Sequence, residues 1–201
     1  MVVESIGRSF DDLPGATELD GGVRRRLLER WQEPHRKYHG VAHLQYGLQV
    51  LDELGGQRLE RIAYWCHDIV HTNTSPRDEY ASVDLTEELL WGRISDVELD
   101  EVTRLILITI KHAPAAGDDA GARISDADLA GLALDWDAYL ENVAGIRAEL
   151  PHLSEAQWRS RRQRQLSGLL ERDRIFHTAH GYSAWEDRAR VNMLRELGAM
   201  R

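Results

Sequence analysis

The sequence predicts an all-α protein made of one domain, and three observations support that prediction. Apolar residues recur at spacings of three and four through almost every segment, and no stretch alternates apolar and polar residues between turns. The 201 residues are 42% hydrophobic and 29% charged, as in ordinary globular proteins. No repeat, low-complexity tract or long linker divides them. We therefore expect a flexible segment over residues 1–15 and a single helical domain over residues 16–201.

The periodicity predicts eight helices, which span residues 23–32, 43–54, 59–70, 77–91, 96–111, 135–149, 154–172 and 185–197. Residues that break or cap helices agree with these boundaries. The Gly-Gly pair at 55–56 ends the second helix, and Pro76 precedes the fourth. Residues 113–122 contain proline and glycine and are expected to form an exposed loop. Ser154 and Gln157 predict a capping box for the seventh helix.

Composition excludes several classes of protein. Asp and Glu outnumber Lys and Arg by 34 to 25, and the net charge of -9 argues against a duplex-DNA binder, whose affinity depends on basic side chains. The longest aliphatic run, residues 105–108, is far shorter than the roughly 20 residues that a membrane span needs. The first residues show neither a basic start nor an apolar stretch, so we expect no secretory signal and a cytoplasmic protein.

Arginine supplies almost all of the positive charge, because Lys37 and Lys111 are the only lysines. The planar guanidinium group of arginine binds phosphate and carboxylate well, although arginine is also common on protein surfaces. The arginines at 159–164 are expected to form mainly a solvated helix face. Arg162 and Arg190 are the two expected to turn inward.

Three segments concentrate His and Asp. Residues 33–44, EPHRKYHGVAHL, place three His and two cations at the approach to a helix. Residues 64–70, YWCHDIV, end an apolar helix with an adjacent His-Asp pair. Residues 124–130, ISDADLA, carry two Asp in an apolar turn, and a buried Asp is costly unless it is paired or bound to a metal. Because the chain has nine His but only one Cys, Cys66, any metal must be held by imidazole nitrogen and carboxylate oxygen.

The order His43, His67-Asp68, Asp128 resembles the signature of the HD superfamily of metal-dependent phosphohydrolases. Longer motifs resemble a family of small bacterial HD phosphohydrolases of unknown substrate. They run in order between residues 31 and 192 as EPHRKYHGVAH, WCHDIVH, DEYAS, TIKH, DADL and EDRARVN. The resemblance implies an HD-type helical bundle that holds a divalent metal ion.

Two positions depart from the pattern of that family. His71 stands where Tyr is usual, and Arg77 stands near a position that is usually acidic. We expect both departures to lie at the mouth of the site.

The resemblance implies four ligands for the metal ion: His43, His67, Asp68 and Asp128. Two of these assignments have alternates, His39 for His43 and Asp126 for Asp128. We favour His43 because an apolar helix begins there, and Asp128 because it fits the pattern of the superfamily. The other member of each pair is then expected to orient a ligand. Mn, Mg, Fe, Co, Ni and Zn are all compatible with imidazole and carboxylate ligands.

Five residues are candidates for the chemistry itself: Asp68, Glu79, His112, Arg36 and Lys37. Asp68 is expected to orient a nucleophilic water, with Glu79 as general base or as a partner of that water. Arg36 and Lys37 are expected to clamp phosphate, and His112 to contact phosphate or a second metal ion. Structural alternatives stand beside these roles. Glu79, Arg36 and Lys37 are also readable as solvated charges, and His112 as a helix C-terminal cap.

The resulting hypothesis is a metal-dependent phosphohydrolase that cleaves a small phosphate ester or nucleotide by attack of a metal-activated water. No base-reading motif identifies the substrate. Two alternatives are a non-catalytic metal- or nucleotide-binding sensor and, with less support, a di-iron oxygenase on the same scaffold. The expected partner is a small phosphorylated molecule, with no duplex DNA and no membrane, and a homodimer is one option for assembly.

Overall fold

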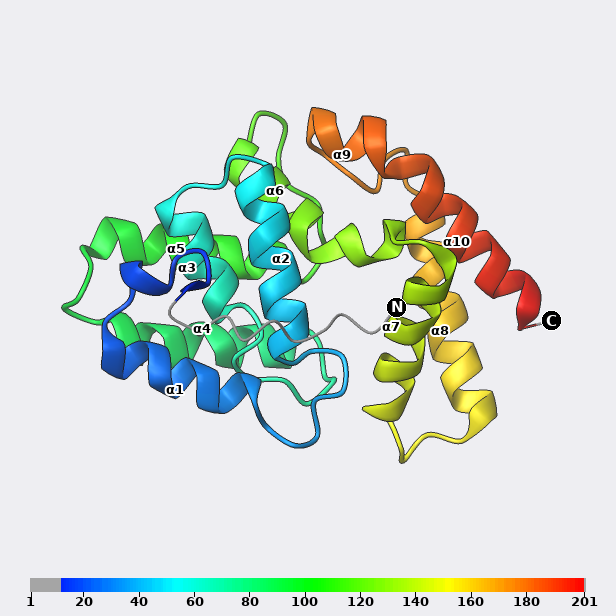
Figure 1. The fold of residues 1–201 in the computed structure, drawn as a ribbon, viewed down its shortest axis with the longest axis horizontal. Coiled ribbons are helices and arrows are strands. Elements are labelled where there is room, and N and C mark those ends of the chain that lie inside the picture. The colour runs from blue at the N-terminus through cyan, green and yellow to red at the C-terminus, as the bar shows by residue number, and fades with distance from the viewer. Residues whose placement is uncertain (1–11, 201) are drawn as a thin grey trace.

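A computed structural model describes residues 12–200, and within that range it contains helices and no strand, which confirms the predicted all-α fold (Figure 1). In chain order the α-helices are α1 (Gly21–Trp31), α2 (Val41–Glu53), α3 (Arg58–Cys66), α4 (Arg77–Leu90), α5 (Asp96–Ile108), α6 (Asp119–Leu129), α7 (Trp136–Ala148), α8 (Glu155–Leu170), α9 (Ala179–Ala184) and α10 (Glu186–Ala199). A short 3-10 helix, Ala130–Ala133, follows α6. None of these helices has both the length and the apolar character to cross a membrane.

Part of the segment predicted to be flexible is fixed to the domain. Leu13 is buried, and the indole of Trp65 donates a hydrogen bond of 2.9 Å to the carbonyl of Pro14. The ordered domain therefore begins before residue 16. The rest of that prediction, residues 1–11, lies outside the described residues.

Helix α3 lies at the centre of the larger core. It packs against α2, α4, α5 and α6, and residues 62–66 are fully buried. Residues surrounded in this way need no polar face, which explains the apolar run 62–66, whereas the first half of the helix carries Arg58, Glu60 and Arg61. The contact with α2 is close because Gly47 has no side chain: a Cβ there would lie 1.8 Å from the hydroxyl of Tyr64.

The end of α3 differs from the sequence prediction, which extended this helix to residue 70. The helix ends at Cys66, because Ile69 donates its N–H to the carbonyl of Cys66, three residues back, at 3.4 Å. Nδ1 of the His67 ring forms a hydrogen bond of 2.8 Å with the carbonyl of Tyr64. His67 and Asp68 therefore stand on a turn that follows α3, with the ring of His67 held against the last turn of that helix.

The C-terminal helices form a second, smaller core, seen in Figure 1 as the group α7, α8 and α10 opposite α1 and α4. Its buried residues include Leu166, Phe176 and Met193. Arg162 turns inward as predicted and pairs with the buried Glu196, with 2.8 Å between Nε and Oε1.

Two helices were not predicted. Helix α6 begins inside the expected loop 113–122, because Asp118 caps it by accepting the N–H of Gly121 (2.9 Å). Helix α9 is six residues long and is capped by Thr178. The predicted capping box of Ser154 and Gln157 at the start of α8 is confirmed.

Candidate metal centre

The four predicted ligand residues come together at the C-terminal end of α3. His43 lies in the first turn of α2, His67 and Asp68 follow α3, and Asp128 lies in the last turn of α6. The Nε2 atom of His43 is 3.0 Å from Oδ1 of Asp128. The Nε2 atom of His67 is 3.4 Å from that oxygen and 3.4 Å from Oδ2 of Asp68. Ligand atoms that surround one ion at about 2.1 Å are separated by roughly 3.0–3.4 Å, so this spacing fits a divalent metal ion.

The ring of His67 is oriented for a ligand. Its Nδ1 lies 2.8 Å from the carbonyl of Tyr64, which can only accept, so Nδ1 carries a proton and Nε2 is the nitrogen that remains to face a metal ion. The Nε2 atoms of His67 and His43 are buried and have no hydrogen-bond partner among residues 12–200. A buried polar atom without a partner is costly, and a cation at this point satisfies both imidazoles. His43, His67 and Asp128 can therefore hold a metal ion.

The carboxylates of the centre are held in their charged form. Burial alone raises the pKa of Asp128, but the imidazoles of His67 and His43 hold it well below its usual range. The same opposition of burial and His67 holds the pKa of Asp68 well below normal. Burial lowers the pKa of His67 itself, and the charges of Asp68 and Asp128 outweigh that effect and raise it well above normal. Negative charge therefore persists at the centre at neutral pH.

The two alternate ligands lie elsewhere. Asp126 is fully buried, and its carboxylate accepts the N–H groups of His177 (2.7 Å) and Thr178 (2.8 Å) and the hydroxyl of Thr178 (2.7 Å). It thus fastens the segment before α9 to α6. His39 belongs to a different group with His71 and Glu149.

The candidate metal centre lies at the floor of a cavity of about 530 Å³. The floor is lined by His43, Asp68 and Asp128, together with Glu79 and His112. The opposite wall belongs to α7 and α8 and is lined by Val143, Ile146, Leu150, Trp158, Arg161 and Arg172. The floor and the wall therefore come from different parts of the chain, the floor from residues before 129 and this wall from residues after 142.

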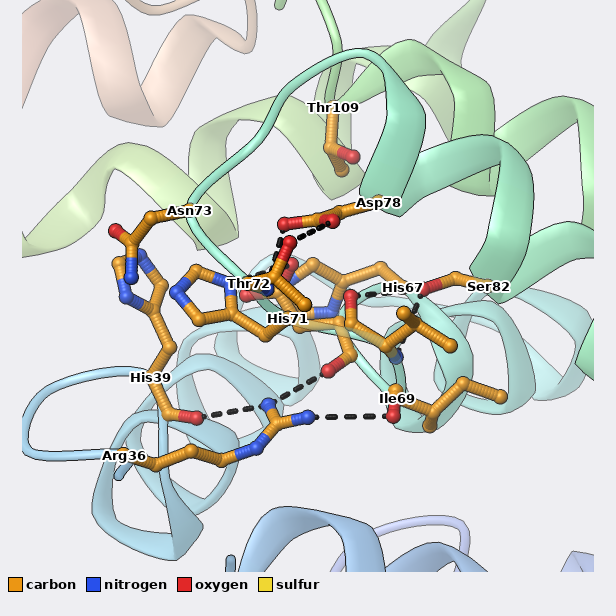
Figure 2. A network of polar contacts seen from close by, with 12 residues as sticks. Arg36, His39, His67, Ile69, His71, Thr72, Asn73, Asp78, Ser82 and Thr109 are labelled. Atoms are coloured by element: carbon orange, nitrogen blue, oxygen red, sulfur yellow. Dashed lines mark hydrogen bonds and ion pairs between the residues drawn. The ribbon is translucent and has the colours of Figure 1, made fainter. Parts of the chain in front are cut away.

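Arg36 does not line the cavity, in contrast to its predicted role as a phosphate clamp. Its buried guanidinium donates to the carbonyls of His39 (3.0 Å), Asp68 (2.7 Å) and Ile69 (3.2 Å), and to the carboxylate of Glu33 (3.1 Å) (Figure 2). These carbonyls lie in turns, where no helix supplies a donor, and the five N–H groups of arginine match them. Arg36 joins the two segments that carry the ligands.

Lys37 is exposed and also does not line the cavity. Only its backbone takes part in the site, by donating an N–H to Glu149 (2.8 Å). The predicted clamp of Arg36 and Lys37 thus gives way to a structural role for this segment.

Glu79 and His112, by contrast, face the cavity as predicted. Glu79 comes from α4, and its Oε2 is buried without a hydrogen-bond partner. His112 has a left-handed backbone conformation (φ 46°), and its carbonyl accepts from Arg172 (3.1 Å) and His177 (3.0 Å). Backbone strain of this kind is typical of functional sites. Burial is the main reason why the pKa of His112 is lowered.

The sequence prediction missed three residues that the structure brings to the cavity and its surroundings. Arg161 and Arg172 donate to the carbonyls of Asn73 (3.0 Å) and His112 (3.1 Å), and within residues 12–200 neither forms an ion pair with a carboxylate. In the predicted helix 154–172 their spacing of eleven residues puts them on one face, and that was a usable signal, although α8 itself ends at Leu170. Glu149 is 110 residues from His39 in the sequence, and no local pattern connects them.

Comparisons of this chain with protein-family models, curated proteins and solved structures give no match.

Proposed function

We propose that the protein is a metal-dependent phosphohydrolase of the HD type that cleaves a small phosphate ester in this cavity. One observation carries the proposal. His43 and two carboxylates line the floor of the cavity with His67 next to them, the Nε2 atoms of both imidazoles have no hydrogen-bond partner within residues 12–200, and two arginines without a carboxylate partner in that range stand in the wall. The floor is complementary to a cation and the wall to an anion. A phosphate ester bound to a divalent cation satisfies both.

The proposed cation site consists of His43, His67 and Asp128, with Asp68 beside them. When bound, a divalent ion supplies Lewis acidity, which activates water as a nucleophile near neutral pH and offsets the charge on the phosphoryl group. Two imidazole nitrogens together with carboxylate oxygens suit Mn, Fe, Co, Ni and Zn. The carboxylate oxygens of the same site also suit Mg.

Residues of the chain supply the remaining roles. The unpartnered Oε2 of Glu79 takes the proton of the attacking water as general base. His112 and Arg172 contact one another through the His112 carbonyl and donate together to the phosphoryl oxygens. Asp68 orients the water, because its carboxylate lies next to the ligand nitrogen of His67.

The proposed substrate carries an organic group in addition to phosphate. Val143, Ile146 and Leu150 give the wall an apolar strip, and the volume of about 530 Å³ is in the range of cavities that hold nucleotide-sized ligands. Arg161 and Arg172 are held at different places in the wall, by the carbonyls of Asn73 and His112 respectively. A substrate with a second anionic group, such as a nucleotide, uses both.

The test is a screen of phosphate release from phosphomonoesters, nucleoside mono-, di- and triphosphates and cyclic nucleotides, with each candidate metal ion. We expect turnover that requires metal and is lost in His67→Ala. Arg172→Gln should raise KM by about 10- to 100-fold, as expected for the loss of a charge-assisted hydrogen bond. Arg159→Gln is the matched control, since Arg159 pairs with Glu155 on the exposed side of the same helix. Tight binding of a nucleotide without turnover under every condition would contradict the enzyme and favour a sensor.

A further inference from the structure

A second group of metal-type ligands lies beside the first and plays no part in the function proposed above. His39, His71 and Glu149 each offer a ligand atom, and these atoms lie within 4.8 Å of one another. Oε2 of Glu149 is 2.7 Å from Nδ1 of His39 and 3.4 Å from Nε2 of His71. Figure 2 shows the rings of His39 and His71 close to one another on the side of the network away from Ser82.

Glu149 is fixed in place before any ligand binds. Its side chain is fully buried, and its Oε1 accepts the backbone N–H groups of Lys37, Tyr38 and His39, each at 2.8 Å. These three bonds hold the carboxylate against the loop and direct Oε2 at the two imidazoles. A ligand carboxylate anchored through its second oxygen is the usual support of a metal site.

The Nε2 atom of His71 is the unsatisfied member of the group. His71 is only 8% exposed, and its Nε2 has no hydrogen-bond partner although Oε2 of Glu149 lies 3.4 Å away. Its ring stacks on that of His39, with 4.0 Å between centroids and 29° between planes. Parallel rings bring their nitrogens toward the same carboxylate oxygen. The arrangement resembles the floor of the cavity, where the buried imidazole nitrogens are also unpartnered.

We propose that His39, His71 and Glu149 bind a second divalent transition-metal ion. Two imidazoles with one carboxylate favour Zn, Co, Ni or Fe over Mg and Ca, which prefer oxygen ligands. Binding replaces the proton shared between His39 and Glu149, and that proton passes to solvent. The two ions are adjacent but separate. Asp68 lies between their ligands, with Oδ2 at 3.4 Å from His67 and Oδ1 at 3.9 Å from His71.

The test counts metal ions and does not depend on any activity. Protein freed of metal with a chelator is titrated with Co²⁺, which is followed by visible absorption, and its Zn²⁺ content after dialysis is measured by mass spectrometry. We expect two equivalents in the wild type and one in His71→Phe, which keeps an aromatic ring in the stack. The double variant His67→Ala/Asp128→Ala should keep one equivalent, bound by His39, His71 and Glu149. His152→Ala removes an exposed histidine outside both groups and should keep two.

Two results would overturn the proposal. One is a single equivalent in the wild type that disappears in His67→Ala/Asp128→Ala. The other is two equivalents that persist in His71→Phe and also in His39→Phe, a second variant that guards against a folding defect in the first. A protein that binds two ions but hydrolyses no phosphate ester would refute the proposed function and leave the second site standing.

Discussion

Two buried polar clusters in this molecule are completed in opposite ways. Between α8 and α10, Arg162 donates to both oxygens of Glu196 (2.8 and 3.1 Å) and to Gln165 (3.0 Å), and the hydroxyl of Tyr139 also bonds Glu196. At the end of α3, the Nε2 atoms of His43 and His67 have no hydrogen-bond partner. The first cluster satisfies its own charges. In the second, these two nitrogens are left without such a partner among residues 12–200, which is the pattern expected of a binding site rather than of a structural cluster.

The largest effect on stability is expected from the satisfied cluster. Arg162→Met leaves the carboxylate of Glu196 buried without its cation, which should cost about 3–5 kcal/mol in urea unfolding. Metal content should be unchanged, because α8 contributes no ligand. Arg164→Met, on the exposed side of α8, is the control and should stay within about 0.5 kcal/mol of the wild type. A loss of metal in Arg162→Met would contradict the view that the two clusters are independent of one another.

The unsatisfied cluster should instead gain stability from its ligand. At a free Zn²⁺ concentration of 100 times the dissociation constant, one site adds about 2.7 kcal/mol to the free energy of unfolding. In the His71→Phe variant only the site formed by His43, His67 and Asp128 can bind the ion, so this variant is used for the measurement. Adding His67→Ala should remove the gain in the free energy of unfolding. If Zn²⁺ stabilises the double variant as much as His71→Phe alone, the end of α3 is not the binding site.

Asp78 lines the cavity, yet both oxygens of its carboxylate accept hydrogen bonds. It therefore tests whether the hydrogen bonding of a buried group matters more than its position in the cavity. Burial raises its pKa, but hydrogen bonds from Thr74 (2.8 Å) and from the hydroxyl (2.7 Å) and N–H (2.6 Å) of Thr72 lower it below the ordinary 3.8. The stabilisation is thus present above pH 4 and is lost as the pH falls through the folded-state pKa. Asp78→Asn should cost about 1–3 kcal/mol at pH 7 and less at pH 3, measured by urea midpoints. An equal cost at both pH values would contradict this account.

The smallest effect is expected in the cavity wall. A Cβ added at Gly168, in the last turn of α8, meets nothing within 4 Å, so Gly168→Ala should stabilise the protein by about 0.5–1 kcal/mol. Gly47→Ala is the opposite case, because its Cβ collides with Tyr64 in the packed core, and it should be destabilising. Destabilisation by Gly168→Ala would show that α8 packs more tightly over the cavity.

Local pattern was enough to predict most of the fold. Three- and four-residue periodicity identified the helices with long amphipathic or apolar stretches, and the Ser154 capping box marked the start of α8. The same rules missed α6, because its first turn contains the glycine and aspartate typical of loops. They also extended α3 too far. Its end depends on the ring of His67 bonding a backbone carbonyl, which spacing alone does not reveal.

The site was predictable only where its residues lie in recognisable motifs. His43, the His67-Asp68 pair and Asp128 were named from sequence order, and the structure brings them together. The role of Arg36 depends on carbonyls more than 30 residues away, so its charge alone suggested phosphate instead. Long-range partners of this kind have no signature in a single sequence.

The division of the cavity between two stretches of chain has a consequence for how such a protein can diverge. The inner metal ligands all precede residue 129, whereas the apolar strip and the cavity arginines belong to α7, α8 and the residue just beyond them. Substitutions in that wall alter the shape and charge presented to a ligand without changing the residues proposed to hold the cation. Selection can therefore change which molecule fits the cavity while the proposed metal ligands are inherited unchanged.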